Sequence, residues 1–161
     1  MSSTLRLALA GVLVLALAAC TAAGPRERTV TVTHAAVTAT LVDAAPTGTS
    51  VGDQRYFSIV VGGDGGVGRI EAILSTTGID VPQKGTEIRT GQLIFTFGTG
   101  EDQVTVLGAS VYPSAGSTIA EGTTTIRPIV GGSGAYAGVS GWCESTHNAD
   151  GTWRHILHLK G

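Results

Sequence analysis

The sequence predicts an all-β domain of about eight antiparallel strands. Segments with strand-like alternation of apolar and polar residues recur along the chain, and short stretches of glycine, proline, aspartate and asparagine separate them. Threonine and valine, which favour strands, are frequent, and no amphipathic helical pattern interrupts the series. Consecutive strands with short connections form either a barrel or a sandwich.

The predicted strands follow one another from Thr29 to the end of the chain. They cover residues 29–42, 54–61, 68–76, 92–97, 103–112, 122–130, 138–146 and 152–160. The first begins with strict alternation in TVTVTH, and GGDGG, GTGED and Pro113 end the second, fourth and fifth. The last two are joined by HNADG, whose Asp-Gly pair is a strong hairpin signal.

Residues 1–19 have the features of a secretory signal peptide. Arg6 precedes an apolar run over residues 7–19, which would span about 20 Å as a helix, short of the ~30 Å hydrocarbon core of a bilayer. The run ends in LAAC, which resembles the bacterial lipobox, a motif whose cysteine carries a diacylglycerol in the mature protein. A plain signal peptide followed by a chance cysteine is the alternative.

The domain boundaries follow from this resemblance. We expect Cys20 to be lipidated, residues 20–28 to form the lipidated end and a short tether, and residues 29–161 to form the β-domain. The protein would then be exported and anchored to the membrane at the extracytoplasmic face of the bacterial cell envelope. Only Cys20 and Cys143 are present, so lipidation of the first leaves no partner for an internal disulfide.

Composition narrows the choice of partners. The formal net charge is −2 and no basic patch is visible, so nucleic acid is not an expected partner.

The surface of the domain has few charges to cover it, because charged residues make up only 14% of the chain. Ile70, Ala72 and Leu74 fall on one face of their strand and Ile73 on the other, so a second apolar face needs cover. A neighbouring subunit in a homo-oligomer, a dimer or a trimer, is one candidate for that cover, and a small loop is another.

The stretch RPIVGGSGAYAGVSG, residues 127–141, is unusually rich in glycine. A phosphate-binding loop is one explanation, but it requires a following helix N-terminus, and the strand-like VSGWCEST follows here. We therefore expect corners with positive φ, Gly132 among them, and a close backbone crossing. Tyr136 would fold over the end of the domain as a plug.

Several of these motifs resemble one family. GDQRYFSIVV, TFGTGEDQVTVLGA, IVGGSGAYAGVSG and the final HILHLKG are similar, in order and spacing, to the allene oxide cyclase and dirigent barrel superfamily. The resemblance covers residues 37–161 and is closest to bacterial allene oxide cyclase-like barrels, some of which are natural-product cyclases. It implies an eight-stranded antiparallel β-barrel, often a trimer, with an apolar pocket at one mouth.

The family's catalytic residues match less well. Plant allene oxide cyclases carry a Glu and an Asn on the first barrel strand, and these positions fall near Thr38 and Thr40, neither of which supplies a carboxylate. A pocket cysteine of that family falls near Leu74. Dirigent proteins use acidic residues near the pocket, and the resemblance places Asp53 comparably. Whether this chain is an enzyme is left open by these matches.

Alternation predicts which side chains line the interior. On the last strand the inward set is Trp153, His155, Leu157 and Leu159, and on the preceding strand it is Cys143, Ser145 and His147. The predicted ligand pocket comprises Phe95, Phe97, Cys143, Ser145, Trp153, His155 and Leu157. The candidate catalytic residues are Asp53, Cys143 and His155, with Cys143 and His155 as a thiolate–imidazolium pair. The alternative is an inert core cysteine and a histidine bonded to a backbone carbonyl.

No metal site and no cofactor are expected. His155 and His158 are three residues apart, which puts them on opposite faces of a strand. Three functions remain: an anchored barrel that binds a small apolar ligand, an isomerase or cyclase that templates the cyclization of a reactive apolar substrate, and a structural surface barrel without a ligand. An open apolar pocket would favour the first two over the third.

Overall fold

The computed structural model describes residues 26–114 and 118–161 of the chain. The predicted signal peptide, the predicted lipidation site at Cys20 and most of the predicted tether lie outside the described residues. Within the described ranges, no helix is long and apolar enough to cross a membrane.

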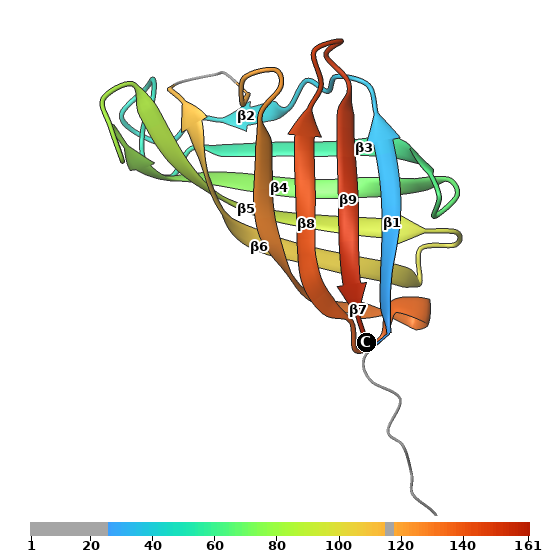
Figure 1. Cartoon of the computed structure of the whole chain (residues 1–161). Coiled ribbons are helices and arrows are strands. Elements are labelled where there is room, and N and C mark those ends of the chain that lie inside the picture. The colour runs from blue at the N-terminus through green and yellow to red at the C-terminus, as the bar shows by residue number, and fades with distance from the viewer. Residues whose placement is uncertain (1–25, 115–117) are drawn as a thin grey trace, which may run out of the picture.

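The described strands form one antiparallel sheet that closes into a barrel (Figure 1). They are β1 (Glu27–His34), β2 (Thr40–Val42), β3 (Gln54–Gly63), β4 (Gly68–Ile79), β5 (Thr86–Phe97), β6 (Asp102–Pro113), β7 (Thr124–Ser133), β8 (Ser140–His147) and β9 (Trp153–Lys160), with the short 3₁₀ helix η1 (Gly134–Tyr136) after β7. The order runs from β1 through β9 down to β3, and β3 pairs back onto β1 at Val32↔Gly63 and Thr33↔Gly62. Eight strands close the barrel as the family resemblance implies, and β2 is a short addition on β3.

Two strands differ from the prediction. Residues 29–42 do not form one strand, because β1 ends at His34 and residues 35–39 cross the barrel end before β2. β5 begins at Thr86 instead of residue 92, and it pairs with β6 along its whole length. The added part of β5 buries Glu87 and Arg89.

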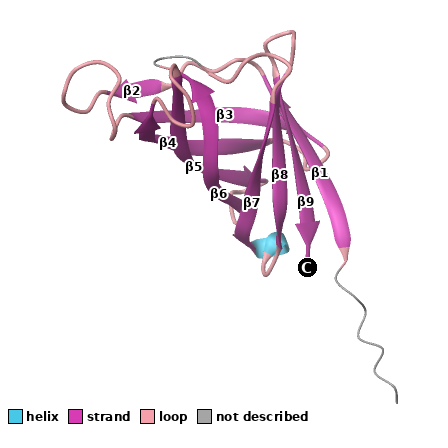
Figure 2. Ribbon diagram, turned by 60° about the vertical axis from the view of Figure 1, so that its left-hand side comes forward, coloured by secondary structure: helices cyan, strands magenta, loops and turns pink. Residues whose placement is uncertain are grey.

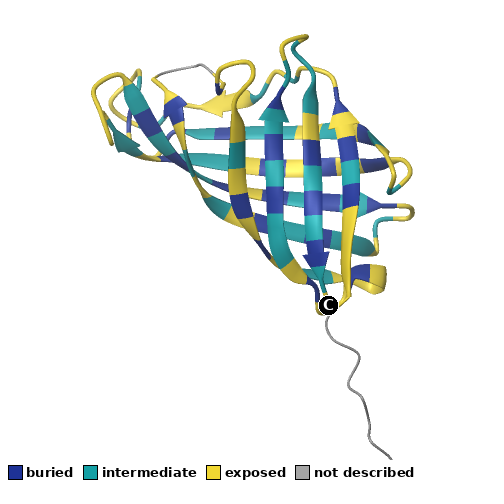
Figure 3. Cartoon of the chain, viewed as in Figure 1, coloured by how far each residue is buried: buried dark blue, intermediate teal, exposed yellow. Residues whose placement is uncertain are grey.

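The interior changes character along the barrel. Near η1 the inward side chains are apolar and packed, including Phe95, Leu157 and Leu159. Farther from η1, the inward side chains include Arg89 of β5 and His155 of β9. Polar groups therefore lie at the end of the barrel opposite η1. Figure 3 shows the alternating buried bands on these strands, and Figure 2 shows the strands diverging from the end that holds η1. One end is therefore filled with apolar side chains, whereas the other is polar and wider.

The glycine-rich segment turns the chain at the packed end. Gly134 has a φ of +57°, the left-handed region expected of a corner. Gly132 does not have a positive φ, so the prediction for that residue is wrong. Close packing excludes a side chain instead, because a Cβ there would lie 2.5 Å from the carbonyl oxygens of Gln103 and Tyr136.

Tyr136 closes this end, as predicted. Its side chain is buried, and its ring centroid lies 5.2 Å from that of Phe97. The guanidinium of Arg28, on β1, lies 4.6 Å from the centre of the tyrosine ring. A ligand cavity therefore has to open at the other end of the barrel.

Candidate functional site

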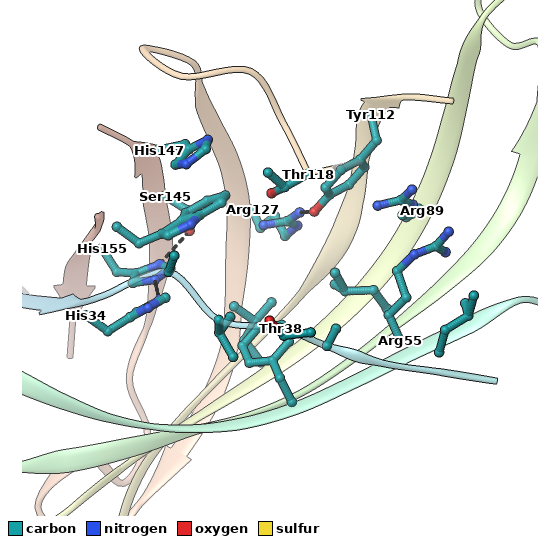
Figure 4. Close-up of a pocket in the computed structure, with 18 residues that line it drawn as sticks. His34, Thr38, Arg55, Arg89, Tyr112, Thr118, Arg127, Ser145, His147 and His155 are labelled. Atoms are coloured by element: carbon teal, nitrogen blue, oxygen red, sulfur yellow. Dashed lines mark hydrogen bonds between the residues drawn. The ribbon is translucent and has the colours of Figure 1, made fainter. Parts of the chain in front are cut away.

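A cavity of about 430 Å³ occupies the wide end of the barrel. Side chains from all eight barrel strands line it, and so do residues 36–39 and Leu41 of β2. Figure 4 shows the lining residues as sticks, Thr38 among them. Its volume is within the usual range for small-molecule sites. The lining falls into an aromatic and imidazole wall and a group of arginines.

The aromatic wall consists of His34, His147, Trp153 and His155. The rings of His147 and Trp153 are stacked at 4.8 Å and those of His34 and His155 at 5.2 Å, with interplanar angles of 11° and 20°. The Nδ1 atom of His147 lies 2.8 Å from the carbonyl oxygen of Ile119, which fixes its ring. Such flat, nearly parallel faces suit a flat unsaturated ligand.

Two side chains of this wall, His34 and His155, form a hydrogen-bonded chain with Ser145. The Nε2 atoms of His34 and His155 are 3.0 Å apart, and the Nδ1 atom of His155 lies 2.9 Å from Ser145 Oγ (Figure 4). His34 Nδ1 lies 2.6 Å from the carbonyl oxygen of Ala35. A carbonyl only accepts, so the proton of neutral His34 is on Nδ1 and its Nε2 accepts from His155. Ser145 then donates to His155, and the order of donors along the chain is fixed.

Burial keeps these imidazoles neutral. Desolvation lowers the pKa of His155 to about 3, and the charges of His34 and Arg127 act in the same direction. Desolvation also lowers the pKa of His34, against a hydrogen bond to Ala35 that raises it. Burial raises the pKa of Cys143 to about 11. Neutral forms of both partners are favoured, so the pKa values do not favour the predicted thiolate–imidazolium pair.

The opposite side of the cavity holds Arg55, Arg89 and Arg127, all buried. Arg89 Nε lies 3.0 Å from Glu87 Oε2, and Arg55 is 4.0 Å from the same oxygen. Arg127 donates to the hydroxyl oxygen of Tyr112 at 2.7 Å. Burial alone would raise the pKa of Glu87, but its hydrogen bond and charge interaction with Arg89 are the largest of the effects that hold it below the ordinary value.

The structure brings together only part of the predicted pocket. Ser145, Trp153 and His155 line the cavity. Cys143 is fully buried beneath it, with its Sγ 3.5 Å from Ser145 Oγ. The other predicted members, Phe95, Phe97 and Leu157, are in the packed apolar cluster and do not line the cavity. Their inward direction was predicted correctly, but alternation does not specify depth along the barrel axis.

Asp53 has a structural position. Its carboxylate accepts hydrogen bonds from the backbone N–H groups of Ala44 and Ser50, and from the Ser50 hydroxyl. The bond from the Ser50 N–H is the largest cause of its lowered pKa. Asp53 is absent from the cavity lining, so it stabilises the turn before β3 instead of facing a ligand there.

Sequence reasoning missed the three arginines, although a signal was present. Arg89 has the same parity as Leu93, Phe95 and Phe97, and Arg127 the same parity as Ile129, so alternation already placed both inward. Thr38 and Leu74, the positions near matched family residues, also line the cavity.

Among the described residues, no group of three or more His, Cys, Asp or Glu is placed to hold a metal ion.

Comparison with known proteins gives structural matches only. No family model and no curated protein sequence matches the chain. A pyocyanin demethylase structure aligns with a TM-score of 0.60 and 20% identity, covering 83% of this chain and 99% of that one. A pterocarpan synthase dirigent protein aligns with a TM-score of 0.59 and 12% identity, over 84% of this chain and 87% of that one. The chain has the eight-stranded barrel fold of the dirigent and allene oxide cyclase-like proteins.

Proposed function

We propose that this protein is an exported, lipid-anchored barrel that binds a small, largely apolar ligand in the cavity at its wide end. The cavity itself supports this most directly, because its volume and mostly apolar lining are those of a small-molecule site. The names of both structural neighbours refer to small organic molecules, pyocyanin and a pterocarpan. Their shared fold is consistent with a ligand site inside the barrel.

Tryptophan fluorescence tests ligand binding at this site. The chain has two tryptophans, of which Trp153 lines the cavity and Trp142 stacks on His158 at 4.5 Å on the outer face. We expect the neutral apolar dye N-phenyl-1-naphthylamine to bind and to quench Trp153. Quenching should persist in Trp142→Phe and disappear in Trp153→Phe. If the dye does not bind, or if the quenching disappears in Trp142→Phe instead, the proposed ligand site is refuted. The function that then remains is a structural barrel without a ligand.

A second candidate function is an isomerase or cyclase that templates a reactive apolar substrate. The Ser145–His155–His34 chain favours it, because this chain of hydrogen bonds can move a proton at the cavity wall. If turnover occurs, a ligand extracted from the protein should be converted to a product of equal mass, detected by liquid chromatography with mass spectrometry. Ser145→Ala should retain dye binding but lose the conversion. Equal conversion by the variant would exclude this role for the chain.

The membrane anchor is a separate part of the proposal. The lipobox-like LAAC and the apolar run before it support the modification of Cys20. Cys20→Ser should release the protein from the membrane fraction and abolish labelling by radioactive palmitate. Cys143→Ser is the matched control, and it should leave both unchanged. Retention of Cys20→Ser in the membrane fraction would refute the lipid anchor.

Self-association is the remaining proposed interaction. Ile126, Val130 and Leu107 are exposed on the outer face of β6 and β7, at 64%, 55% and 43% of their surface. A second copy of the chain could cover them, in a dimer or a trimer. Native mass spectrometry of the protein gives the copy number, and a monomer at micromolar concentration would refute this part.

A further inference from the structure

We propose that the cavity selects ligands that carry an acidic group, a carboxylate or a similar oxyanion, and that Arg127 with its neighbours Arg55 and Arg89 binds that group. This inference rests on the proposed ligand-binding function and names the chemical class of the ligand. It depends on the balance of charge inside the barrel and on the position of the arginines relative to the aromatic wall.

The buried charges on this side of the cavity do not balance. Three guanidinium groups line it, those of Arg55, Arg89 and Arg127, and each residue is at most 8% exposed. Glu87 is the carboxylate within ion-pair distance, and it is shared by Arg89 and Arg55. Asp53 is the next acid, but its oxygens are engaged by backbone and serine donors. Even with both acids counted, one positive charge remains.

Arg127 carries the unbalanced charge. It is 3% exposed and forms no ion pair with any described residue. Its partners are neutral hydroxyls, Tyr112 at 2.7 Å and Thr125 at 3.2 Å, and its Nε has no hydrogen-bond partner among the described residues. Residues 115–117, outside the described ranges, are Ala-Gly-Ser and contain no acid. An arginine does not lose its proton in proteins, so this charge persists in the folded barrel.

The neighbouring groups do not remove this positive field. Burial lowers the pKa of Arg55, and the charge of Arg89 lowers it further, which shows that the two cations act on each other. Arg89 also lies over the ring of Tyr112, with 4.5 Å between its guanidinium carbon and the ring centre. Tyr112 therefore lies between two arginines. Buried like charges of this kind are stabilised by an anion that enters the site.

The position of the arginines also defines the shape of the ligand. In Figure 4, Arg127 is the arginine nearest to the aromatic wall, and Tyr112, Arg89 and Arg55 lie farther from it. A ligand could place a flat apolar body against His155 and Trp153 and direct its acidic group to Arg127. Guanidinium groups bind carboxylates through two parallel hydrogen bonds, which suits this arrangement. The geometry therefore points to a flat, unsaturated acid.

A pair of probes that differ in one group tests the inference. 2-Naphthoate and 2-naphthamide share a ring system and nearly the same shape, but only the first is an anion at neutral pH. In calorimetric titrations of the full-length chain, we expect 2-naphthoate to bind at least about tenfold more tightly, the usual scale of one charge-assisted hydrogen bond. The Arg127→Gln variant should lose this preference and bind 2-naphthamide within about twofold of the original affinity.

The controls separate the outcomes. Arg154→Gln removes an exposed arginine from β9 and should change neither affinity. Equal or tighter binding of 2-naphthamide by the unmodified chain would overturn the acidic-ligand inference, while the proposed apolar cavity would stand. Failure of both probes and of N-phenyl-1-naphthylamine would overturn the proposed function as well. If Arg127→Gln does not fold in a thermal melt, the comparison of the two probes on the unmodified chain decides the matter.

Discussion

At the scale of single residues, one backbone carbonyl fixes the protonation of the cavity wall. The oxygen of Ala35 accepts from His34, which makes His155 a donor to His34 and an acceptor from Ser145. Cys143 completes the series as a donor to Ser145. Because each group has one arrangement that satisfies its neighbours, the neutral wall is rigid, which favours binding of a ligand without reordering the side chains.

The protonation of His155 predicts how stability depends on pH. Its folded pKa of about 3 is below the ordinary value of about 6.5, so between these values the unfolded chain binds a proton that the folded chain does not. Neutral His155 therefore makes its full contribution to the free energy of unfolding above pH 6.5. On acidification the free energy of unfolding should fall by up to about 1.4 kcal/mol for each pH unit. His34 and Arg127, which face His155 from β1 and β7, act in the same sense by disfavouring its charged form.

Urea denaturation at pH 7.5, 6.0 and 5.0 measures this dependence. His155→Gln should flatten it, leaving a smaller slope from His34, whose pKa is also lowered. His158→Gln, on the outer side of the same strand, is the matched control and should keep the full slope. Equal slopes for His155→Gln and the original chain would contradict the neutral, buried state of His155.

The alternation of residues along the strands predicted which side chains point into the barrel, but it predicted only some of the residues that line the cavity. The inward sets on β8 and β9 are correct, because a strand that borders a packed core must alternate. The arginines were missed because charged residues are rarely buried, and because the predicted strand over residues 92–97 began after Arg89. The rule fails at the cavity, whose lining includes the buried side chains of Arg55, Arg89 and Arg127.

At the scale of elements, the sequence located the glycine-rich turn after β7 correctly, but it did not give the correct reason for each glycine there. The sequence places glycines from the end of β7 to the start of β8, and the positive φ values of Gly131, Gly134, Gly138 and Gly141 confirm corners there. The reason differs from one position to the next. Gly134 needs both a left-handed backbone and space, since a Cβ there would lie 2.2 Å from Asp102 Oδ1, whereas Gly132 needs space alone. A sequence shows that a side chain is missing, whereas the close approach of Gln103 and Tyr136 is a property of the packed fold.

Gly132→Ala tests the crowding at this turn. The new Cβ would lie 2.5 Å from two carbonyl oxygens, so β7, β6 or η1 must shift. We expect the free energy of unfolding to fall by about 2 kcal/mol or more, within the range of overpacking in cores. Gly62→Ala, where a Cβ meets nothing within 4 Å, is the control for added bulk alone. Denaturant midpoints within error of each other for the two variants would refute the packing explanation.

At the scale of the whole molecule, closure was the least accessible feature from the residues alone. Strand patterns allowed a barrel or a sandwich, and the family resemblance was needed to choose the barrel. The seam between β1 and β3 explains the difficulty, since it consists of two paired positions, Val32↔Gly63 and Thr33↔Gly62. No local pattern specifies so short a contact between strands far apart in sequence. The cavity depends on this seam, because His34 lies on β1 directly beyond it.

Gly63→Ala tests whether the seam holds the cavity in shape. A Cβ on Gly63 would lie 2.1 Å from the carbonyl oxygen of Thr31, and its φ of +150° also disfavours a side chain, so β1 must move away from β3. We expect a loss of about 2 kcal/mol in unfolding free energy and faster amide exchange at Val32. Because His34 then shifts within the aromatic wall, N-phenyl-1-naphthylamine should bind several-fold more weakly. Gly62→Ala changes the adjacent glycine without a clash and should retain both stability and dye binding. If Gly63→Ala bound the dye as tightly as Gly62→Ala despite its lower stability, the cavity would not depend on closure at this seam.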